Sequence, residues 1–392
     1  MMEPKIRFKG FEGEWKNLPF SDIVERASVS GQAGTLPGIE FEDIVSGEGC
    51  FNKNIYQKEC CKYGKLFYEG DILFGKLRPY LKNIILADFN GVAIGDFWIL
   101  RSKGYDKKYL YTLVNSESFL KVANISSGSK MPRADWNLVS ATKFVVPSAK
   151  EEQKAIGKYF TSLDSQISAS TSRLASLKQM KAASLQAMFP QEGETVPKVR
   201  FKGFEGEWKK VKVSTLLEER REFDKMSDEY PLMAFIANIG VADKGDRYDR
   251  SSLVNDIENK LYKKTDLGDF IYSSNNLETG SIGLNRYGKA TISPVYSIFK
   301  CTDKSNYDFI GCAFTRKEFI NNMVKWRQGV MYGQWRIHES DFFKIEILVP
   351  SIDEQRCIGD YFTSLDHQIT LQTQRLEKLK QIKSACLDKM FV

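Results

Sequence analysis

The sequence predicts a mixed α/β chain with two similar globular domains and two long helices that pair with each other. Two observations carry this prediction. An N-terminal segment recurs near the middle of the chain, and a helical segment with regularly spaced apolar residues recurs at its end. The 392 residues are 42% hydrophobic and 27% charged, which suffices for two or three domains with sizeable cores.

The repeat has two conserved borders. Residues 4–18 recur at 197–211 with 12 identities in 15 positions, and residues 152–189 recur at 354–391 with 23 identities in 38. This period is too long for a solenoid. The borders predict a first domain at 1–150, a central helix at 151–190, a linker and second domain at 191–350, and a C-terminal helix at 351–392.

Between the borders the halves diverge but keep a common outline. Gly70-Asp71-Ile72-Leu73-Phe74 matches Gly268-Asp269-Phe270-Ile271-Tyr272, and alternating residues at 65–68 and 97–100 indicate further short strands. Amphipathic helices are expected near Tyr109–Ala123 and Phe309–Trp326. One scaffold with two different surfaces indicates two recognition modules that read different targets.

The two copies of the long helix carry apolar residues at a spacing close to 3.5. Each seam is interrupted by polar residues, so each helix needs a partner, which is either the other copy or its own domain. If the copies pair antiparallel, the chain acquires a pseudo-twofold axis. The coiled-coil seam predicted from the sequence consists of Phe160, Leu163, Ile167, Leu174 and Leu177 in one copy, and Phe362, Leu365, Ile369, Leu376 and Leu379 in the other.

Residues typical of catalysis and metal binding are scarce. The sequence has two histidines, no C-x-x-C or H-E-x-x-H pattern, no phosphate-binding P-loop and no amino-methyltransferase tetrapeptide. Asp71 and Asp269 follow a glycine at the entry to a strand, which is ordinary turn chemistry. We therefore expect no catalytic residue and no metal site in this chain.

Charge and targeting signals narrow the class of protein. The net charge is +7, and residues 51–150 carry 16 basic against 8 acidic side chains. This surplus indicates either a polyanionic partner or a solvated lysine-rich surface. The sequence has no secretory signal and no long apolar stretch, and its seven cysteines show no paired spacing. These features predict a cytoplasmic protein with no membrane contact.

Two variable segments, each opened by R-F-x-x-F-x-G-x-W and followed by V-P-S, E-Q and Y-F-T-S-L-D, resemble the specificity subunit of type I restriction-modification systems. The resemblance covers essentially the whole chain. It implies that each variable segment is a target recognition domain for one half of a split double-stranded DNA site, and that the long helices form an antiparallel coiled coil that sets the gap.

The same resemblance implies the partners and cofactors. Two modification subunits would dock on the helices and methylate adenine with S-adenosylmethionine, and restriction subunits that use ATP and Mg would join them. No cofactor is expected in this chain, which is identified as a non-catalytic subunit of a methyltransferase and endonuclease complex.

DNA recognition needs basic side chains for phosphates and planar polar side chains for base edges. The loops after the matched strands and the later polar loops supply both, although a phosphate or solvent contact is an alternative for each residue. The near-identical segments around Trp15 and Trp208 serve either as framework or as a docking surface. The DNA-binding candidates are Lys76, Arg78, Tyr80, Ser129, Lys130 and Arg133 in the first domain, and Asn275, Asn276, Arg286, Gln334 and Arg336 in the second.

Two other functions stay open on the residues alone. The chain could be a non-catalytic coiled-coil scaffold with two ligand-binding modules that do not bind nucleic acid, or a stand-alone endonuclease or methyltransferase. Salt-sensitive binding to duplex DNA separates the first of these from a DNA-recognition subunit, because counterion release makes affinity fall with salt.

Overall fold

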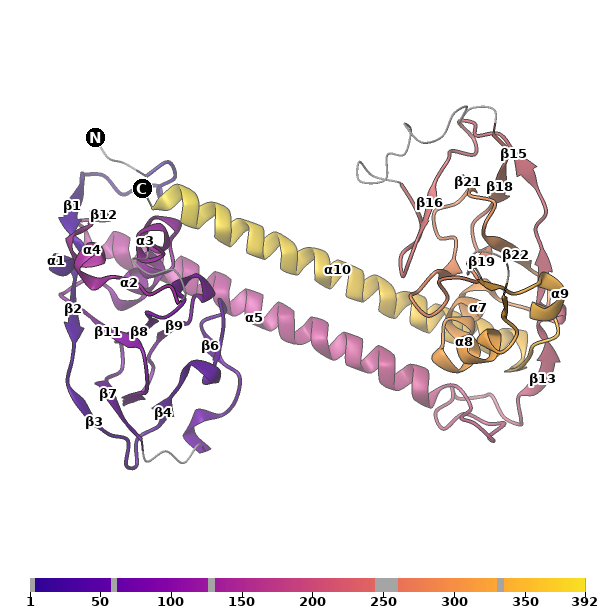
Figure 1. Ribbon diagram of the computed structural model, residues 1–392, viewed down its shortest axis with the longest axis horizontal. Coiled ribbons are helices and arrows are strands. Elements are labelled where there is room, and N and C mark those ends of the chain that lie inside the picture. Colours follow the sequence, from indigo (N-terminus) through magenta and orange to yellow (C-terminus); the bar gives the residue numbers. More distant parts are fainter. Residues whose placement is uncertain (1–3, 58–61, 126–130, 244–259, 330–334, 392) are drawn as a thin grey trace. The chain divides into compact units, whose positions relative to one another are not determined.

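The computed structural model describes residues 4–57, 62–125, 131–243, 260–329 and 335–391 (Figure 1). The chain divides into two compact units. Unit 1 comprises residues 1–172 and 373–392, and unit 2 comprises residues 173–372. Each unit therefore contains part of both long helices, α5 (Lys150–Ala187) and α10 (Ile352–Met390).

The part of unit 1 that precedes α5 in the sequence consists of short strands and short helices. Its strands are β1 (Trp15–Pro19), β2 (Val24–Ala27), β3 (Ser30–Gln32), β4 (Gly38–Ile39), β5 (Ile44–Val45), β6 (Cys50–Phe51), β7 (Tyr63–Phe67), β8 (Ile72–Gly75), β9 (Ile84–Leu86), β10 (Gly91–Ala93), β11 (Phe97–Ser102) and β12 (Lys143–Pro147). Its short helices are α1 (Phe20–Ile23), α2 (Lys107–Val114), α3 (Glu117–Ala123) and α4 (Trp136–Ala141).

A central sheet of order β2-β11-β8-β9 separates two apolar cores among the described residues of unit 1. Successive residues of β8 point to opposite faces, so Ile72 and Phe74 join the core with the helices while Leu73 faces the second sheet, β3-β7-β10-β4. This two-sided burial explains why β8 is continuously apolar. The ladder of β1 with β12 brings the two ends of the variable segment together.

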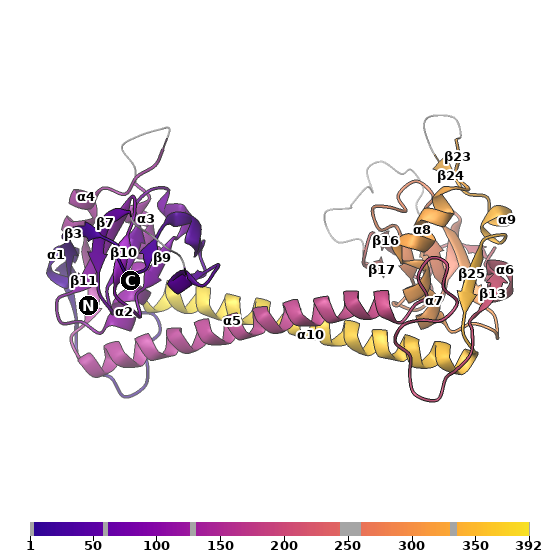
Figure 2. The same ribbon diagram turned by 90° about the horizontal axis from the view of Figure 1, so that it is seen from below.

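Unit 2 resembles unit 1 in the order of its main elements, and its described residues include an additional strand pair, β23 with β24, between α8 and α9. Its strands are β13 (Lys209–Lys212), β14 (Leu217–Glu219), β15 (Phe223–Asp224), β16 (Ala234–Ile236), β17 (Gly240–Ala242), β18 (Tyr262–Thr265), β19 (Phe270–Tyr272), β20 (Ile282–Leu284), β21 (Ala290–Ile292), β22 (Ser297–Cys301), β23 (Gln328–Gly329), β24 (Trp335–Arg336) and β25 (Glu346–Val349). Its short helices are α6 (Val213–Leu216), α7 (Tyr307–Phe314), α8 (Lys317–Val324) and α9 (Glu339–Phe342) (Figure 2).

The central sheet of unit 2 has the equivalent order, β14-β22-β19-β20, within the described residues. Phe270 and Tyr272 of β19 pack into the core with the helices, and Ile271 packs on the opposite face. The ladder of β13 with β25 again joins the two ends of the variable segment. The mixed α/β fold class with long helices is thus confirmed.

The start of α5 is tied to the N-terminal segment through a buried carboxylate. Arg7 donates to the two oxygens of Glu152 at 2.7 and 2.9 Å, and Trp15 Nε1 donates to the same carboxylate at 3.3 Å. The Glu152 side chain is 1% exposed. A buried charge is stable only when it is paired, so these contacts hold the conserved borders of unit 1 together.

Unit 2 repeats the ion pair. Arg200 donates to Glu354 at 2.6 and 2.7 Å, and the Glu354 side chain is 1% exposed. The contact of the tryptophan differs between the units. Trp208 is buried, but its Nε1 has no hydrogen-bond partner among the described residues. These contacts support a framework role for the near-identical segments around Trp15 and Trp208.

A glycine near the start of each long helix permits close approach of the domain. A Cβ at Gly157 would lie 2.7 Å from the backbone nitrogen of Tyr109, and a Cβ at Gly359 would lie 3.0 Å from that of Phe309. One turn before Gly157, the side chain of Gln153 accepts a hydrogen bond from the Asp106 backbone at 2.9 Å. The long helices therefore start as integral parts of the domains and not as free rods.

In unit 1 the start of α5 lies against the end of α10. Asp164 pairs with Lys383 at 2.6 Å, and the Tyr159 hydroxyl lies 3.5 Å from the Cys386 sulfur. Residue numbers rise along one helix as they fall along the other, so the two helices are antiparallel. Phe391, which follows α10, is 5% exposed and stacks on the buried Tyr109 with ring centroids 5.9 Å apart.

Unit 2 contains the same contacts with the copies exchanged. Lys181 of α5 pairs with Asp366 of α10, and Ser184 lies 2.9 Å from the Tyr361 hydroxyl. Phe189, which follows α5, is 2% exposed and stacks on Phe309 at 5.7 Å. The helices are therefore antiparallel in this unit as well, and they pair with each other while also packing on the domains.

The residues predicted for the coiled-coil seam are all at least partly buried. Phe160, Leu163 and Leu177 on α5, and Phe362, Leu365 and Leu376 on α10, are 7% exposed or less. Half-buried positions are Ile167 and Leu174 on α5, and Ile369 and Leu379 on α10.

Two helices expected from the sequence are each split. The segment Tyr109–Ala123 forms α2 and α3, because the Ser116 side chain accepts a hydrogen bond from the Phe119 backbone at 3.3 Å and caps a new helix. The segment Phe309–Trp326 divides into α7 and α8 at the equivalent place. Amphipathic periodicity continues across such a short break, which hides it in the sequence. In the described part of the chain, no helix is long and apolar enough to cross a membrane.

The aromatic residue after each helix should stabilise the unit in which it lies. Replacing Phe391 by alanine removes a buried ring from unit 1, and we expect the free energy of unfolding to fall by about 3 kcal/mol. Urea unfolding followed by circular dichroism measures this change. Phe189→Ala is the equivalent change in unit 2, and Leu371→Ala, at a position 51% exposed on α10, is the control. Equal stability of Phe391→Ala and the control would contradict the inferred packing.

The buried carboxylate of unit 1 should be equally important. Glu152→Ala leaves Arg7 and Trp15 without their acceptor, so we expect a loss of about 3 kcal/mol in the free energy of unfolding. The neighbouring Glu151 is exposed, and Glu151→Ala should change stability by less than about 0.5 kcal/mol. Similar urea midpoints for the two variants would show that the ion pair does not hold the border segments.

Candidate nucleic-acid interface

Two loops that are far apart in the sequence of unit 1 lie side by side. The Arg78 backbone donates to the Pro132 carbonyl at 2.8 Å, and the Ala134 backbone donates to the Lys76 carbonyl at 2.9 Å. Leu77 and Arg133 form an isolated β-bridge between these contacts. The loop after β8 is thus fixed against the segment before α4.

This pairing gathers the candidate residues of the first domain. Lys76, Arg78, Tyr80 and Arg133 all lie on the two joined segments, with Arg78 exposed and Tyr80 54% exposed. Arg78 adopts a positive φ of 50°, which turns the chain sharply at the tip. Ser129 and Lys130 lie outside the described residues.

The basic side chains are anchored by one carboxylate. Lys76 Nζ and Arg133 Nη2 each lie 3.1 Å from an oxygen of Asp96, on the segment that enters β11. The three side chains remain 29%, 59% and 31% exposed respectively, so these ion pairs stabilise the fold by little. Their effect is to position cations at the surface.

Each unit also contains a partly buried lysine that is not among the candidates predicted from the sequence. Lys65 Nζ donates to the Phe97 carbonyl in unit 1, and Lys263 Nζ donates to the Tyr296 carbonyl at 2.8 Å in unit 2. Burial lowers the pKa of both ammonium groups. The available signal was their equal spacing, six residues before Asp71 and Asp269.

In unit 2 a comparable pair of loops carries the candidates. The Asn275 side chain accepts a hydrogen bond from the Trp335 backbone at 2.6 Å, and Ser274 accepts one from Ile337 at 3.0 Å. These contacts place Asn275 next to β24, which contains Arg336 and pairs with β23. Figure 2 shows where β23 and β24 lie in unit 2. Trp335 is 49% exposed there.

The other candidates of the second domain are placed differently. Asn276 is exposed next to Asn275, and its backbone closes the turn by accepting from Ser281 at 2.9 Å. Arg286 instead pairs with Asp308 of α7 at 2.8 Å, and Asp308 also accepts from Thr363 of α10 at 2.9 Å. Arg286 therefore lies toward the helices and not in the loop cluster, and Gln334 lies outside the described residues.

The aspartates at the turns are structural. Asp71 accepts from the Tyr68 backbone at 2.9 Å and from Arg101 at 2.9 and 2.7 Å, and these hydrogen bonds raise the pKa of Arg101. Asp269 accepts from the Asp266 backbone at 2.7 Å and from the Thr265 hydroxyl at 3.1 Å. This supports the interpretation of both residues as turn residues.

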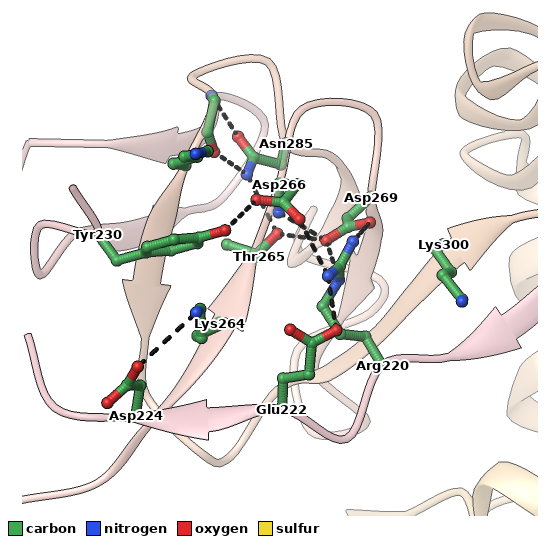
Figure 3. A network of polar contacts seen from close by, with 12 residues as sticks. Arg220, Glu222, Asp224, Tyr230, Lys264, Thr265, Asp266, Asp269, Asn285 and Lys300 are labelled. Atoms are coloured by element: carbon green, nitrogen blue, oxygen red, sulfur yellow. Dashed lines mark hydrogen bonds and ion pairs between the residues drawn. The ribbon is translucent and has the colours of Figure 1, made fainter.

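The arginine that neutralises the buried turn aspartate comes from a different strand in unit 2. Arg220, after β14, lies 2.8 Å from Asp269 and 2.9 Å from both Asp266 and Glu222 (Figure 3). Lys300 occupies the strand position of Arg101 but pairs with Glu218 at 3.0 Å. Across the described ranges, no group of three or more His, Cys, Asp or Glu residues could hold a metal ion.

The chain is similar to known proteins in sequence and in fold. Residues 207–381 match the family of the type I restriction modification DNA specificity domain. Over 120 residues the chain is 25% identical to the type I restriction enzyme EcoDI specificity subunit of Escherichia coli, a match that covers 29% of this chain and 27% of that subunit. The matched part thus spans about a quarter of that relative.

Two solved structures extend the comparison over the chain length. The type I restriction-modification system S subunit from M. genitalium is 13% identical with a TM-score of 0.62, covering 100% of this chain and 99% of that chain. The HsdS subunit from Thermoanaerobacter tengcongensis is 16% identical with a TM-score of 0.45, covering 97% of each chain. The first of these likenesses shows a shared fold.

The repeated borders, the equivalent contacts within the two units and the family match agree with one another. The resemblance to type I specificity subunits that the repeated motifs indicate is therefore confirmed, and residues 207–381 are similar to the type I restriction modification DNA specificity domain.

Proposed function

We propose that this chain is the DNA sequence-recognition subunit of a type I restriction-modification complex. Each domain would read one half of a bipartite duplex site, the first with residues 1–150 and the second with residues 191–350, while the helices at 151–190 and 351–392 carry the conserved contacts. The observation that carries this proposal is a frame repeated in both units with loops that differ in charge and in planar polar side chains.

The loop chemistry supports the proposal. Arginine can bind guanine and asparagine can bind adenine through paired hydrogen bonds in the major groove, while lysine neutralises phosphates. Unit 1 offers Arg78, Arg133 and Lys76 on joined segments, and unit 2 offers Asn275 and Arg336. Different residue types in the two clusters fit two different half-sites.

Docking of two modification subunits is a further part of the proposal. Each unit contains a cleft beside the helix pair, with volumes of about 840 Å³ in unit 1 and about 600 Å³ in unit 2. The equivalent ion pairs Asp164–Lys383 and Asp366–Lys181 line the respective clefts. Equivalent surfaces suit two copies of one partner, which would carry the methylation chemistry and its S-adenosylmethionine. Restriction subunits with ATP and Mg would join later.

Binding of the full chain to duplex DNA should depend steeply on salt and on the loop arginines. We expect Arg78→Ala to weaken binding of a mixed-sequence 40-base-pair duplex several-fold and to reduce the slope of log affinity against log salt by about one. Fluorescence anisotropy at several salt concentrations measures both quantities. Lys16→Ala, which removes an exposed charge on β1, is the matched control. Salt-independent binding, or no binding, would favour the scaffold function instead.

The variable segment of unit 1 should be exchangeable. Residues 19–146 begin and end on the β1–β12 ladder, so replacement by the corresponding segment of another specificity subunit keeps the frame intact. We expect the hybrid to change one half-site and leave the other unchanged, as mapped by methylation sequencing in cells that supply modification subunits. A hybrid that changes both half-sites would exclude independent modules.

A further inference from the structure

Asp96 has an unusual position for a carboxylate on a DNA-binding surface. Its two oxygens each receive one cation, Lys76 and Arg133, at 3.1 Å. Its backbone carbonyl also accepts from the Lys76 backbone at 2.9 Å, which fixes the carboxylate beside the loop after β8. The side chain is 31% exposed, so DNA can approach it from solvent.

The surroundings of Asp96 carry an excess of positive charge. Burial lowers the pKa of Lys65, and the neighbouring Lys76 and Arg26 lower it further, whereas Asp96 acts in the opposite direction. Arg26 itself lies over the Trp136 ring at 4.7 Å. Asp96 pairs with Lys76 and Arg133 and also acts on Lys65, so the mutual repulsion of these cations increases if its charge is removed.

Unit 2 reaches a related arrangement with residues from other positions. Val295, which is 73% exposed, stands at the position equivalent to Asp96. The carboxylate there comes from Glu339 of α9, which lies 3.7 Å from Arg336 and accepts from the Ser297 hydroxyl at 2.8 Å. Burial lowers the pKa of Lys263, and the charge of Glu339 opposes this lowering. Both units thus place a carboxylate beside their basic loop residues, although it comes from different positions in the chain. This recurrence indicates that the negative charge matters more than the backbone position that supplies it.

A carboxylate that receives a lysine and an arginine on its two oxygens resembles the two non-bridging oxygens of a DNA phosphate. We propose that Asp96 holds Lys76 and Arg133 in the DNA-free chain as an internal substitute for a backbone phosphate, and that it weakens binding to DNA of the wrong sequence. This inference rests on the proposed function and adds a residue that limits sequence-independent binding without contacting a base.

The physical reason is a competition between two anions. A phosphate that approaches Lys76 and Arg133 must replace an acceptor already in place and meets the negative charge of Asp96. Sequence-independent affinity comes almost wholly from such phosphate contacts, whereas base contacts add only at the correct site. Asp96 therefore lowers the affinity for every sequence, and only a site that adds base contacts keeps enough affinity to stay bound.

The test compares two variants that remove the same charge. Asp96→Asn should raise the affinity of the full chain for a mixed-sequence 40-base-pair duplex roughly five- to ten-fold at 0.1 M salt and steepen the salt slope by about one, because the positive charge that Asp96 neutralised can then act on a phosphate. Asp88→Asn removes an exposed carboxylate of the same unit and should change affinity less than about two-fold. Anisotropy titration measures both variants.

Further variants separate charge from folding. Asp96→Glu keeps the charge and should bind mixed-sequence DNA like the wild type, and Asp96→Ser replaces Asp96→Asn if that variant does not fold. Equal affinities for Asp96→Asn and Asp88→Asn, with salt-dependent wild-type binding intact, would overturn this inference alone. Absence of salt-dependent binding in the wild type would overturn the proposed function together with it.

Discussion

Each unit depends on an aromatic residue delivered by the other half of the sequence repeat. Phe391 follows the second copy of the helix and stacks on Tyr109 in unit 1, and Phe189 follows the first copy and stacks on Phe309 in unit 2. Neither core is complete without this ring. Antiparallel pairing of the helices is therefore a requirement of the domain cores as well as of the helical seam.

The buried charges show how far the frame is shared. Glu152 pairs with Arg7 and Glu354 pairs with Arg200, and these two arginines occupy equivalent positions in the two copies of the N-terminal repeat. The same ion pair therefore holds the borders of both units. The turn aspartates follow another rule, because Asp71 is neutralised by Arg101 and Asp269 by Arg220. A buried carboxylate needs a cation, but the cation can come from any strand within reach.

The candidate DNA surfaces are made where pairs of loops meet. In unit 1 the β-bridge of Leu77 with Arg133 joins two loops, and in unit 2 the hydrogen bond from Trp335 to Asn275 does so. The unit 1 loops can change residue type without disturbing the sheets behind them, because their contacts are largely through the backbone, whereas the unit 2 loops are joined through the side chains of Asn275 and Ser274. This separation of frame and loops suits a protein whose two halves read different targets.

The sequence by itself determined the repeat, the long helices and the strands around Asp71 and Asp269, and it predicted a helical seam. These features are encoded by periodicity and by identity within short segments, which can be read without knowing the fold. It also selected Lys76 and Arg78 after a matched strand and Arg133 in a separate polar loop as candidates for DNA binding.

The tertiary structure alone decided which side chains meet. Arg286 lies toward α7 and α10 because Asp308 pairs with it, the helix predicted at Tyr109–Ala123 breaks at the Ser116 cap, and Lys65 and Asp96 join the basic loop. These outcomes depend on strand register and on contacts between segments far apart in the chain. Such contacts leave no local pattern in the sequence, so only the packed fold reveals them.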